Sequence, residues 1–350
     1  MVVHFSIIAA AATTLLATDI HWGFRLLLAV VIGHSYGCLM YLAHDILHGS
    51  VIKNQSLQSL LSGVCMLPYC LGPAHWKAWH NRSHHCHTSK AGRDPDSFGN
   101  VPMIMTNSVA RFMIKIAPGS RYAFSFLFLG YWFSFHTIVT LFIHSKLYKY
   151  WKPQQRRRVI ALFAAMVGFW AAVLALVGPF HFAFIYVLPV IVANVVQMSY
   201  ISTNHLFCTE TEATNDPIVN SLTVTSPRWV SWMHLQFGYH VEHHIFPFMS
   251  PKHAPQVQTA IKERFGDRYH EMPLTQALRI LYQTPPVHLS PRELVDLRSG
   301  AVYSTLGEHG ELPQRVDQVS VPVRPRRRTD RKKPPISEQA AAKETRKRAA

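Results

Sequence analysis

Histidines in three short clusters are the residues of this chain whose types and spacing could do chemistry. Eight histidines share this arrangement: His44 and His48; His80, His84 and His85; and His240, His243 and His244. Neutral imidazole is a good ligand for divalent iron, zinc, copper and nickel. Residues three or four apart share one face of a helix, so each cluster can direct several ring nitrogens toward one point. Eight ligands exceed the needs of one ion and suit two nearby ions with about four or five ligands each.

Chance clustering is the main alternative, because histidine makes up 22 of the 350 residues. A lone histidine is usually a surface residue or a hydrogen-bonded core residue. Three separate clusters, of which two end in a His-His pair, are hard to explain in this way and favour metal binding. The five cysteines do not compete as ligands, because they form neither a Cys-x-x-Cys pair nor a zinc-ribbon spacing. They are typical of reduced thiols rather than of a disulfide framework.

The elements that hold these clusters are predicted to be membrane helices. The chain is 49% hydrophobic and only 15% charged. Residues 24–43, 159–177 and 182–201 form apolar runs that approach the roughly 20 residues needed to cross a bilayer. Residues 5–17 form a shorter apolar run without a basic segment before it, which we interpret as a first spanning helix rather than a cleaved signal.

The order of the apolar runs constrains the topology, since all three clusters must reach one side of the membrane. Three runs separate the second cluster from the third: residues 122–143, 159–177 and 182–201. The basic segment 144–158 is expected to stay cytoplasmic, so residues 122–143 are predicted to lie along the membrane or to re-enter it. The next two runs would form a hairpin turned at Gly178 and Pro179. We therefore predict an all-α, multi-pass integral membrane protein with about four transmembrane helices, whose histidine-rich cap faces the cytoplasm.

Two regions are predicted along the chain: a membrane domain over residues 1–310 and a basic disordered tail over residues 311–350. Within the first region, residues 251–265 and 273–282 are predicted to be amphipathic helices that cap the catalytic face. The last 30 residues carry 11 Lys or Arg against 3 Asp or Glu, a balance of +8 within a formal net charge of +16. Such a tail can contact anionic membrane lipids or keep the topology positive-inside. No folded nucleic-acid motif accompanies it, so nucleic acid is not expected as a partner.

The three clusters, taken with their neighbours, resemble the histidine boxes of a known membrane family. The first reads HDILHGS over residues 44–50, and the second reads HNRSHHCHT over residues 80–88, followed by DPD at 94–96. The third reads HVEHHIFP over residues 240–247. Their order and spacing are similar to those of the integral-membrane fatty acid desaturase and hydroxylase superfamily, and the flanking residues resemble acyl-lipid desaturases. Each box alone is weakly specific, whereas the ordered set is strong.

The resemblance implies a di-iron enzyme that uses O2 as co-substrate and takes two electrons from outside. The chain shows no dinucleotide fingerprint, iron-sulfur cysteine run or haem-binding cytochrome domain, so the electrons are expected from a separate ferredoxin, rubredoxin or cytochrome-type donor with its reductase. The family commonly places an additional histidine at the end of the helix before the third box. His205 occupies that position in the segment NHLF at 204–207, and we predict it as a ninth iron ligand. His87 and His234 are predicted to be supporting or structural residues.

Carboxylates inside and beside the clusters are expected to orient the imidazoles by accepting their other N–H. Asp45 and Glu242 lie within clusters, and Asp94 and Asp96 follow the second one. Asn204, next to His205, is placed with this supporting set. A related branch of the family has its asparagine one turn before the histidine, where this chain has Ile201.

The leading prediction is a fatty acid desaturase that acts on a long acyl chain carried as a lipid, a thioester or a free acid. The same residues are compatible with a fatty acyl hydroxylase, an acetylenase or an alkene-forming decarboxylase. The third cluster begins with His240 rather than the glutamine typical of front-end desaturases. A zinc-dependent membrane hydrolase is a different class, which zinc without iron or oxygen consumption would identify. A metal-binding transporter or receptor ranks last, because the apolar runs hold few ionisable residues.

Overall fold

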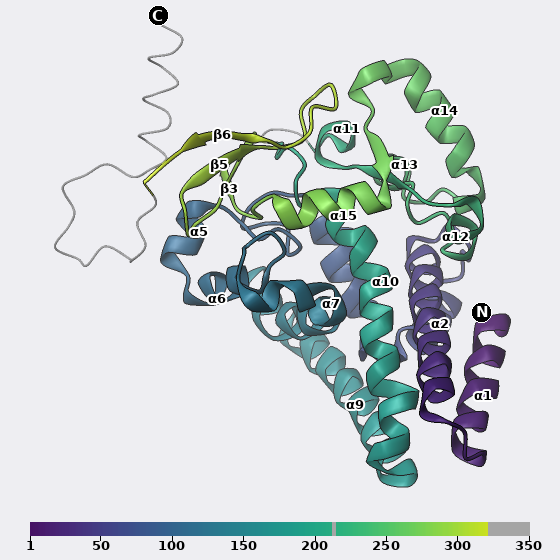
Figure 1. Ribbon diagram of the computed structural model, residues 1–350. Helices are drawn as coiled ribbons and strands as arrows, with labels where there is room; N and C mark the ends of the chain where they lie inside the picture. The colour runs from purple at the N-terminus through teal and green to yellow at the C-terminus, as the bar shows by residue number, and fades with distance from the viewer. Residues whose placement is uncertain (212–214, 321–350) are drawn as a thin grey trace, which may run out of the picture.

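The computed structural model describes residues 1–211 and 215–320 of the 350-residue chain. Four helices project together from one side of the molecule (Figure 1): α1 (Val2–Ala17), α2 (Trp22–His48), α9 (Pro153–Phe182) and α10 (Leu188–His205). The shorter helices and the strands gather at the opposite end of these four. All five cysteines are free, in agreement with the prediction that they are reduced thiols.

The predicted hairpin between the third and fourth long helices is confirmed. Figure 1 shows α9 and α10 as two arms that meet far from the shorter elements. Gly178 interrupts α9 with φ 75° and ψ 164°, a conformation that glycine adopts at little cost. Pro179 follows it and lacks the backbone N–H that a continuous helix would need. The π-helix η5 (Ala183–Val187) then leads into α10.

Three stretches of the described chain are long and apolar enough to cross a membrane: Trp22–His48, Ala123–Leu147 and Pro153–His205. The last contains the hairpin, and α1 is shorter, with 16 residues. We predicted that the stretch Ala123–Leu147 does not cross the membrane, but it is also long and apolar enough to do so. The number of crossings therefore stays a prediction. This stretch consists of four pieces: η3 (Ala123–Leu127), α7 (Phe128–Val139), the π-helix η4 (Thr140–His144) and α8 (Ser145–Leu147).

Helix α10 packs against both α2 and α7. Glycine lets α2 approach closely, because a Cβ atom at Gly33 would lie only 2.5 Å from the carbonyl oxygen of Pro189. The hydroxyl of Tyr41 on α2 donates to the carbonyl of Val196 at 2.9 Å. On the other side, the amide of Asn194 donates to Ser134 Oγ on α7 at 2.9 Å. These contacts bring the ends of α2 and α10 together.

The cap is built from short elements that connect and follow the long helices. Its helical elements before α10 are α3 (Gln55–Cys65), η1 (Leu67–Tyr69), α4 (Pro73–Trp76), the π-helix η2 (Lys77–His84), α5 (Val101–Thr106) and α6 (Ser108–Ile116). Those after α10 are α11 (Pro217–Asn220), α12 (Arg228–Met233), α13 (His240–Ile245), η6 (Pro251–His253), α14 (Ala254–Phe265), η7 (Gly266–Arg268) and α15 (Leu274–Gln283). The two predicted helices over 251–265 and 273–282 are confirmed by η6 with α14 and by α15.

Two small sheets add to the helical fold. Strands β1 (Thr223–Thr225) and β2 (Glu271–Pro273) pair in parallel. The antiparallel sheet runs in the order β3 (His288–Ser290), β4 (Glu293–Val295), β5 (Ala301–Ser304) and β6 (Arg315–Gln318). The disordered tail was predicted to begin at residue 311, but strand β6 lies beyond that residue, which corrects the boundary. The residues of β6 are polar, and backbone hydrogen bonds to β5 order them. Residues 321–350 of the predicted tail lie outside the described residues.

Candidate metal centre

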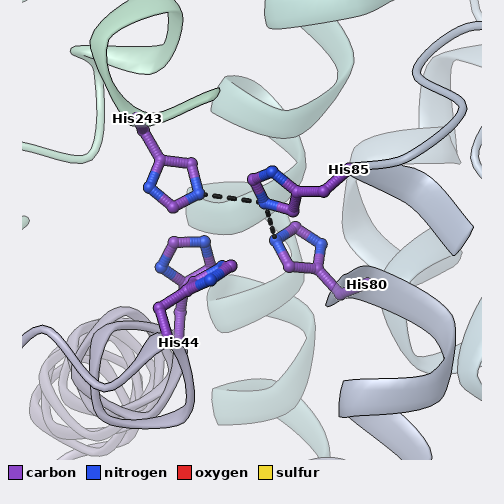
Figure 2. A group of neighbouring side chains, drawn as sticks. His44, His80, His85 and His243 are labelled. Carbon is purple, nitrogen blue, oxygen red and sulfur yellow. Dashed lines mark hydrogen bonds between the residues drawn. The ribbon is translucent and has the colours of Figure 1, made fainter. Parts of the chain in front are cut away.

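The nine predicted ligands come together at the ends of α2 and α10. They form two groups, in each of which one ligand atom per residue lies within 4.8 Å of the others. The five-histidine group consists of His44, His48, His80, His85 and His243, and the four-histidine group of His84, His205, His240 and His244. Figure 2 shows His44, His80, His85 and His243 pointing toward one another from different elements. This division matches the expected four or five ligands for each of two ions.

The second cluster divides between the two groups because of a π-helical turn. In η2 the hydrogen bonds span five residues, and π-turns are frequent at functional sites. His80 and His85, five apart, therefore share a face, and their Nε2 atoms lie 3.1 Å from each other. His84 points into the other group. The sequence predicted that each cluster directs its nitrogens toward one point, whereas the second cluster supplies ligand atoms to both groups.

The third cluster lies on the short helix α13 and also supplies both groups. His240 and His244 are one turn apart, with their Nε2 atoms 3.1 Å from each other. His243 projects toward the five-histidine group, where its Nε2 lies 3.1 Å from Nε2 of His85. The first cluster contributes His44 and His48 from the last turn of α2, which ends at Gly49 in the left-handed conformation with φ 75°.

His205, the last residue of α10, is placed in the four-histidine group. Its Nε2 lies 2.7 Å from Nε2 of His240. Its Nδ1 lies 3.0 Å from the carbonyl oxygen of Asn220, and only a protonated Nδ1 can donate there. That contact assigns the tautomer and leaves the Nε2 lone pair directed at the group. The geometry thus fits the predicted ninth ligand.

The chemistry of these donors fits two metal ions. Nε2 of His44 and of His48 are buried and have no hydrogen-bond partner within the described part of the chain, whereas buried polar atoms normally have one. Burial, with smaller contributions from neighbouring histidines, lowers the pKa of His80, His85 and His243 far below the usual value. These imidazoles are therefore neutral at physiological pH, which is the protonation state that binds metals.

Three of the predicted supporting carboxylates contact histidines of the groups. Asp45 Oδ1 lies 3.0 Å from Nδ1 of His44, and Asp94 lies 3.1 Å from Nδ1 of His84. Asp96 is 3.3 Å from the same nitrogen and lies within 4.8 Å of ligand atoms of both His80 and His84. Burial alone would lower the pKa of His84, but Asp94 and Asp96 outweigh it and raise that pKa to about 9.

Glu242 is a correction to the predicted supporting set. Its carboxylate accepts from the hydroxyl of Tyr269 at 2.6 Å and from that of Thr223 at 2.7 Å. These partners lie on the face of α13 that points away from the histidines, so Glu242 anchors the helix and does not orient an imidazole. Asn204 also differs, because its buried side-chain atoms have no hydrogen-bond partner among the described residues.

Two supporting residues were missed in the sequence. Nε2 of His136 on α7 lies 2.9 Å from Asp96 Oδ1, and Trp79 Nε1 donates to the same oxygen at 2.7 Å. His136 could have been identified from the sequence, because it lies within an apolar run and ionisable residues in such runs are usually functional. The two histidines that were predicted to be supporting or structural lie outside both groups: His87 contacts the carbonyl of Ser83, and His234 contacts His34.

An apolar cavity borders the two groups. Its walls include five imidazoles, from His44, His80, His84, His205 and His240. Most other lining side chains are apolar: Met40, Tyr41, Trp76, Trp79, Phe133, Ile201 and Phe237. A cavity with these walls suits an apolar ligand placed directly beside the metal ligands.

Comparison with known proteins gives two findings. The family model for fatty acid desaturases matches residues 20–275, a range that includes all nine histidines. The chloroplastic omega-3 fatty acid desaturase of Glycine max is 27% identical over 293 residues, which is 76% of this chain and 59% of that protein. The chain therefore spans about three-fifths of the length of that relative.

Proposed function

The chain belongs to the fatty acid desaturase family, and from that premise we propose that it is a membrane-bound oxidoreductase that inserts a double bond into a long acyl chain. The observation that carries the proposal is the placement of nine imidazoles in two groups beside an apolar cavity. An acyl chain in this cavity would have its methylene groups next to the metal ligands. The reaction removes two hydrogen atoms from the chain and reduces O2 to water with two further electrons.

Iron is the metal that we propose for this reaction. Two iron ions, held by the five-histidine and four-histidine groups, would supply one-electron redox chemistry and oxygen reduction, which zinc lacks. The imidazoles of both groups would bind through unprotonated nitrogens, so His84 would release a proton when an ion binds. Asp45 and Asp94 accept the remaining N–H groups of His44 and His84 and so fix the orientation of these rings.

The aromatic walls of the cavity have a second role. Trp79, Phe133 and Phe237 line the cavity beside the histidines. Their aromatic side chains would exclude water from the oxidising centre. The electrons come from a separate ferredoxin, rubredoxin or cytochrome-type donor and its reductase. We place the protein in the membrane as a multi-pass enzyme with this centre at the cytoplasmic face.

Expression in a host that lacks related desaturases tests the proposed function. The host would be supplied with oleic and linoleic acids, because the soybean relative is named for the omega-3 position. Gas chromatography of total fatty acids should reveal a new double bond with the wild-type chain and none with His84→Ala or His244→Ala. A hydroxy, acetylenic or terminal-alkene product would replace the desaturase assignment with another oxidation. Purified protein that holds zinc alone and consumes no oxygen would indicate a hydrolase instead.

A further inference from the structure

A third group of metal-binding side chains lies outside the two histidine groups. His34, Cys38 and His234 each offer one ligand atom within 4.8 Å of the others. We propose that these three residues form a separate zinc site, which joins the middle of α2 to the end of α12. The proposal does not depend on the reaction that the main centre performs.

The distances agree with one ion bound by all three residues. Nε2 of His34 lies 3.1 Å from Nε2 of His234, and Sγ of Cys38 lies 3.8 and 3.9 Å from the ring nitrogens of His34. In tetrahedral zinc sites, Zn–N is about 2.0–2.1 Å and Zn–S about 2.3 Å, so neighbouring ligand atoms are roughly 3.3–3.6 Å apart. The pairs His34–His234 and His34–Cys38 therefore differ from these separations by only a few tenths of an ångström, and the pair Cys38–His234 lies within 4.8 Å.

The surroundings of His234 prepare its ring for this role. The hydroxyl of the buried Tyr200 lies 3.0 Å from Nδ1 of His234. An Nδ1–H that donates to this oxygen leaves the Nε2 lone pair facing His34, which is the usual support for a metal-binding histidine.

The donor set selects the kind of metal. One thiolate and two imidazoles suit zinc and other borderline or soft ions, whereas magnesium and calcium prefer oxygen ligands. His34 and Cys38 are one helical turn apart on α2, so they face the same side. His34 is only half-buried, which leaves room for a fourth, non-protein ligand.

A site here would constrain the third histidine cluster. His234 precedes His240 by six residues, and Phe237 between them packs on both Tyr41 and His44. An ion bound at His234 would hold this segment against α2 from outside the main centre. The alternative is a plain hydrogen bond, in which the two imidazoles share one proton and Cys38 remains a thiol.

Cobalt spectroscopy separates these two cases, because the five-histidine and four-histidine groups contain no cysteine. The full-length protein would be purified with its iron from cells grown with cobalt in place of zinc. We expect about one additional cobalt per chain and a thiolate-to-cobalt absorption band in the near ultraviolet. Cys38→Ser should abolish the band, and His34→Ala should weaken cobalt binding by about tenfold or more. Cys65→Ser, which replaces another buried free cysteine, should retain both.

A folded wild-type protein without the thiolate band would overturn the zinc site, whatever the behaviour of the variants. Persistence of the band in Cys38→Ser would also overturn it. Neither result would alter the fatty acid analysis, which tests the main centre alone. Conversely, a wild-type chain that leaves all acyl chains unchanged but shows the band would contradict the proposed reaction and retain the third site.

Discussion

At the scale of single residues, His84 and His85 illustrate how adjacent side chains acquire different partners. His85 contacts His80 and His243 in the five-histidine group. The ring of His84 instead lies 4.8 Å from that of His205, between ring centres. The π-turn that ends at His84 rotates the two side chains apart, because each turn contains more residues than an α-helical turn. One extra residue in a turn thus distributes one sequence motif over the two histidine groups.

Replacement of His205 by alanine tests its role as a ligand. We expect His205→Ala to lower iron content and to reduce oxidation of the acyl chain by at least roughly 100-fold, since even supporting residues cost 10–100-fold. Metal analysis and fatty acid analysis of the purified and expressed protein provide the measurements. His87→Ala is the matched control. His87 also lies next to the two histidine groups, but its ring nitrogen contacts a backbone carbonyl. Full iron and normal turnover in His205→Ala would exclude a ligand role.

Asp94→Asn tests whether a carboxylate must face His84. All the groups around Asp94 donate hydrogen bonds: Nδ1 of His84, the backbone N–H of Ser89 and that of Asp96. An asparagine amide would place N–H groups against at least one of these donors, which leaves a buried donor unpaired. We expect iron affinity to fall by about 10–100-fold, measured by competition with a chelator. Unchanged affinity would show that Asp94 shapes the loop and does not support the metal.

At the scale of elements, α13 is held in place by Glu242 from the side opposite the histidines. Burial raises the pKa of this carboxyl group, while the hydrogen bonds from Tyr269 and Thr223 act to lower it. The ionised form therefore depends on these two hydroxyls. Because α14 and β2 flank Tyr269, the contact ties the third cluster to the part of the cap that follows it.

Tyr269→Phe should lower stability without removing a ligand. The change leaves one oxygen of a buried carboxylate unsatisfied, at a cost of about 1–3 kcal/mol, and thermal unfolding in detergent should shift down by several degrees. The pKa of Glu242 should rise further, so the stability deficit should grow as the pH increases and the folded carboxyl group is forced to ionise. Tyr282→Phe is the control, since that hydroxyl has only a 3.5 Å contact with a backbone carbonyl. A deficit equal in both variants would contradict the anchoring role.

At the scale of the whole molecule, the proposed membrane topology depends on the hairpin of α9 and α10. The basic segment before α9 should remain in the cytoplasm, and the turn at Gly178 should be exported. Reporter fusions after Lys152 and after Gly178 measure this directly. An exported reporter after Lys152 would place the three histidine clusters on different sides or require a different number of crossings.

Two truncations separate the basic C-terminal residues from the folded sheet. Removal of residues 321–350 eliminates 11 basic residues and no histidine, so activity in detergent should be retained while binding to anionic vesicles weakens. Termination after Leu312 also removes β6, whose backbone pairs with β5. That change should expose a strand edge and promote aggregation, seen by size-exclusion chromatography. Equal behaviour of the two truncated proteins would show that β6 contributes nothing.

The amino-acid sequence by itself predicted which histidines gather in the two groups and where the long helices lie. Both are local properties: histidine spacing within a few residues and apolar runs of about 20 residues. The hairpin at Gly178 and Pro179 could also be predicted from the sequence, because these two residues interrupt a helix through their own backbone chemistry. The family resemblance followed from the same local motifs and from their order along the chain.

Only the tertiary structure decided how these pieces combine. The packing of α2 on α10, through Gly33 and through the hydrogen bond from Tyr41 to Val196, brings His44 and His205 to one cavity. The sequence of either helix alone does not specify this arrangement. The role of His136 depends on α7 meeting the loop that carries Asp96, and the approach of His234 to His34 joins residues 200 positions apart. Strand β6 is ordered by hydrogen bonds to another strand rather than by its own polar residues. Contacts between distant segments depend on the packing of the whole chain, which no local pattern contains.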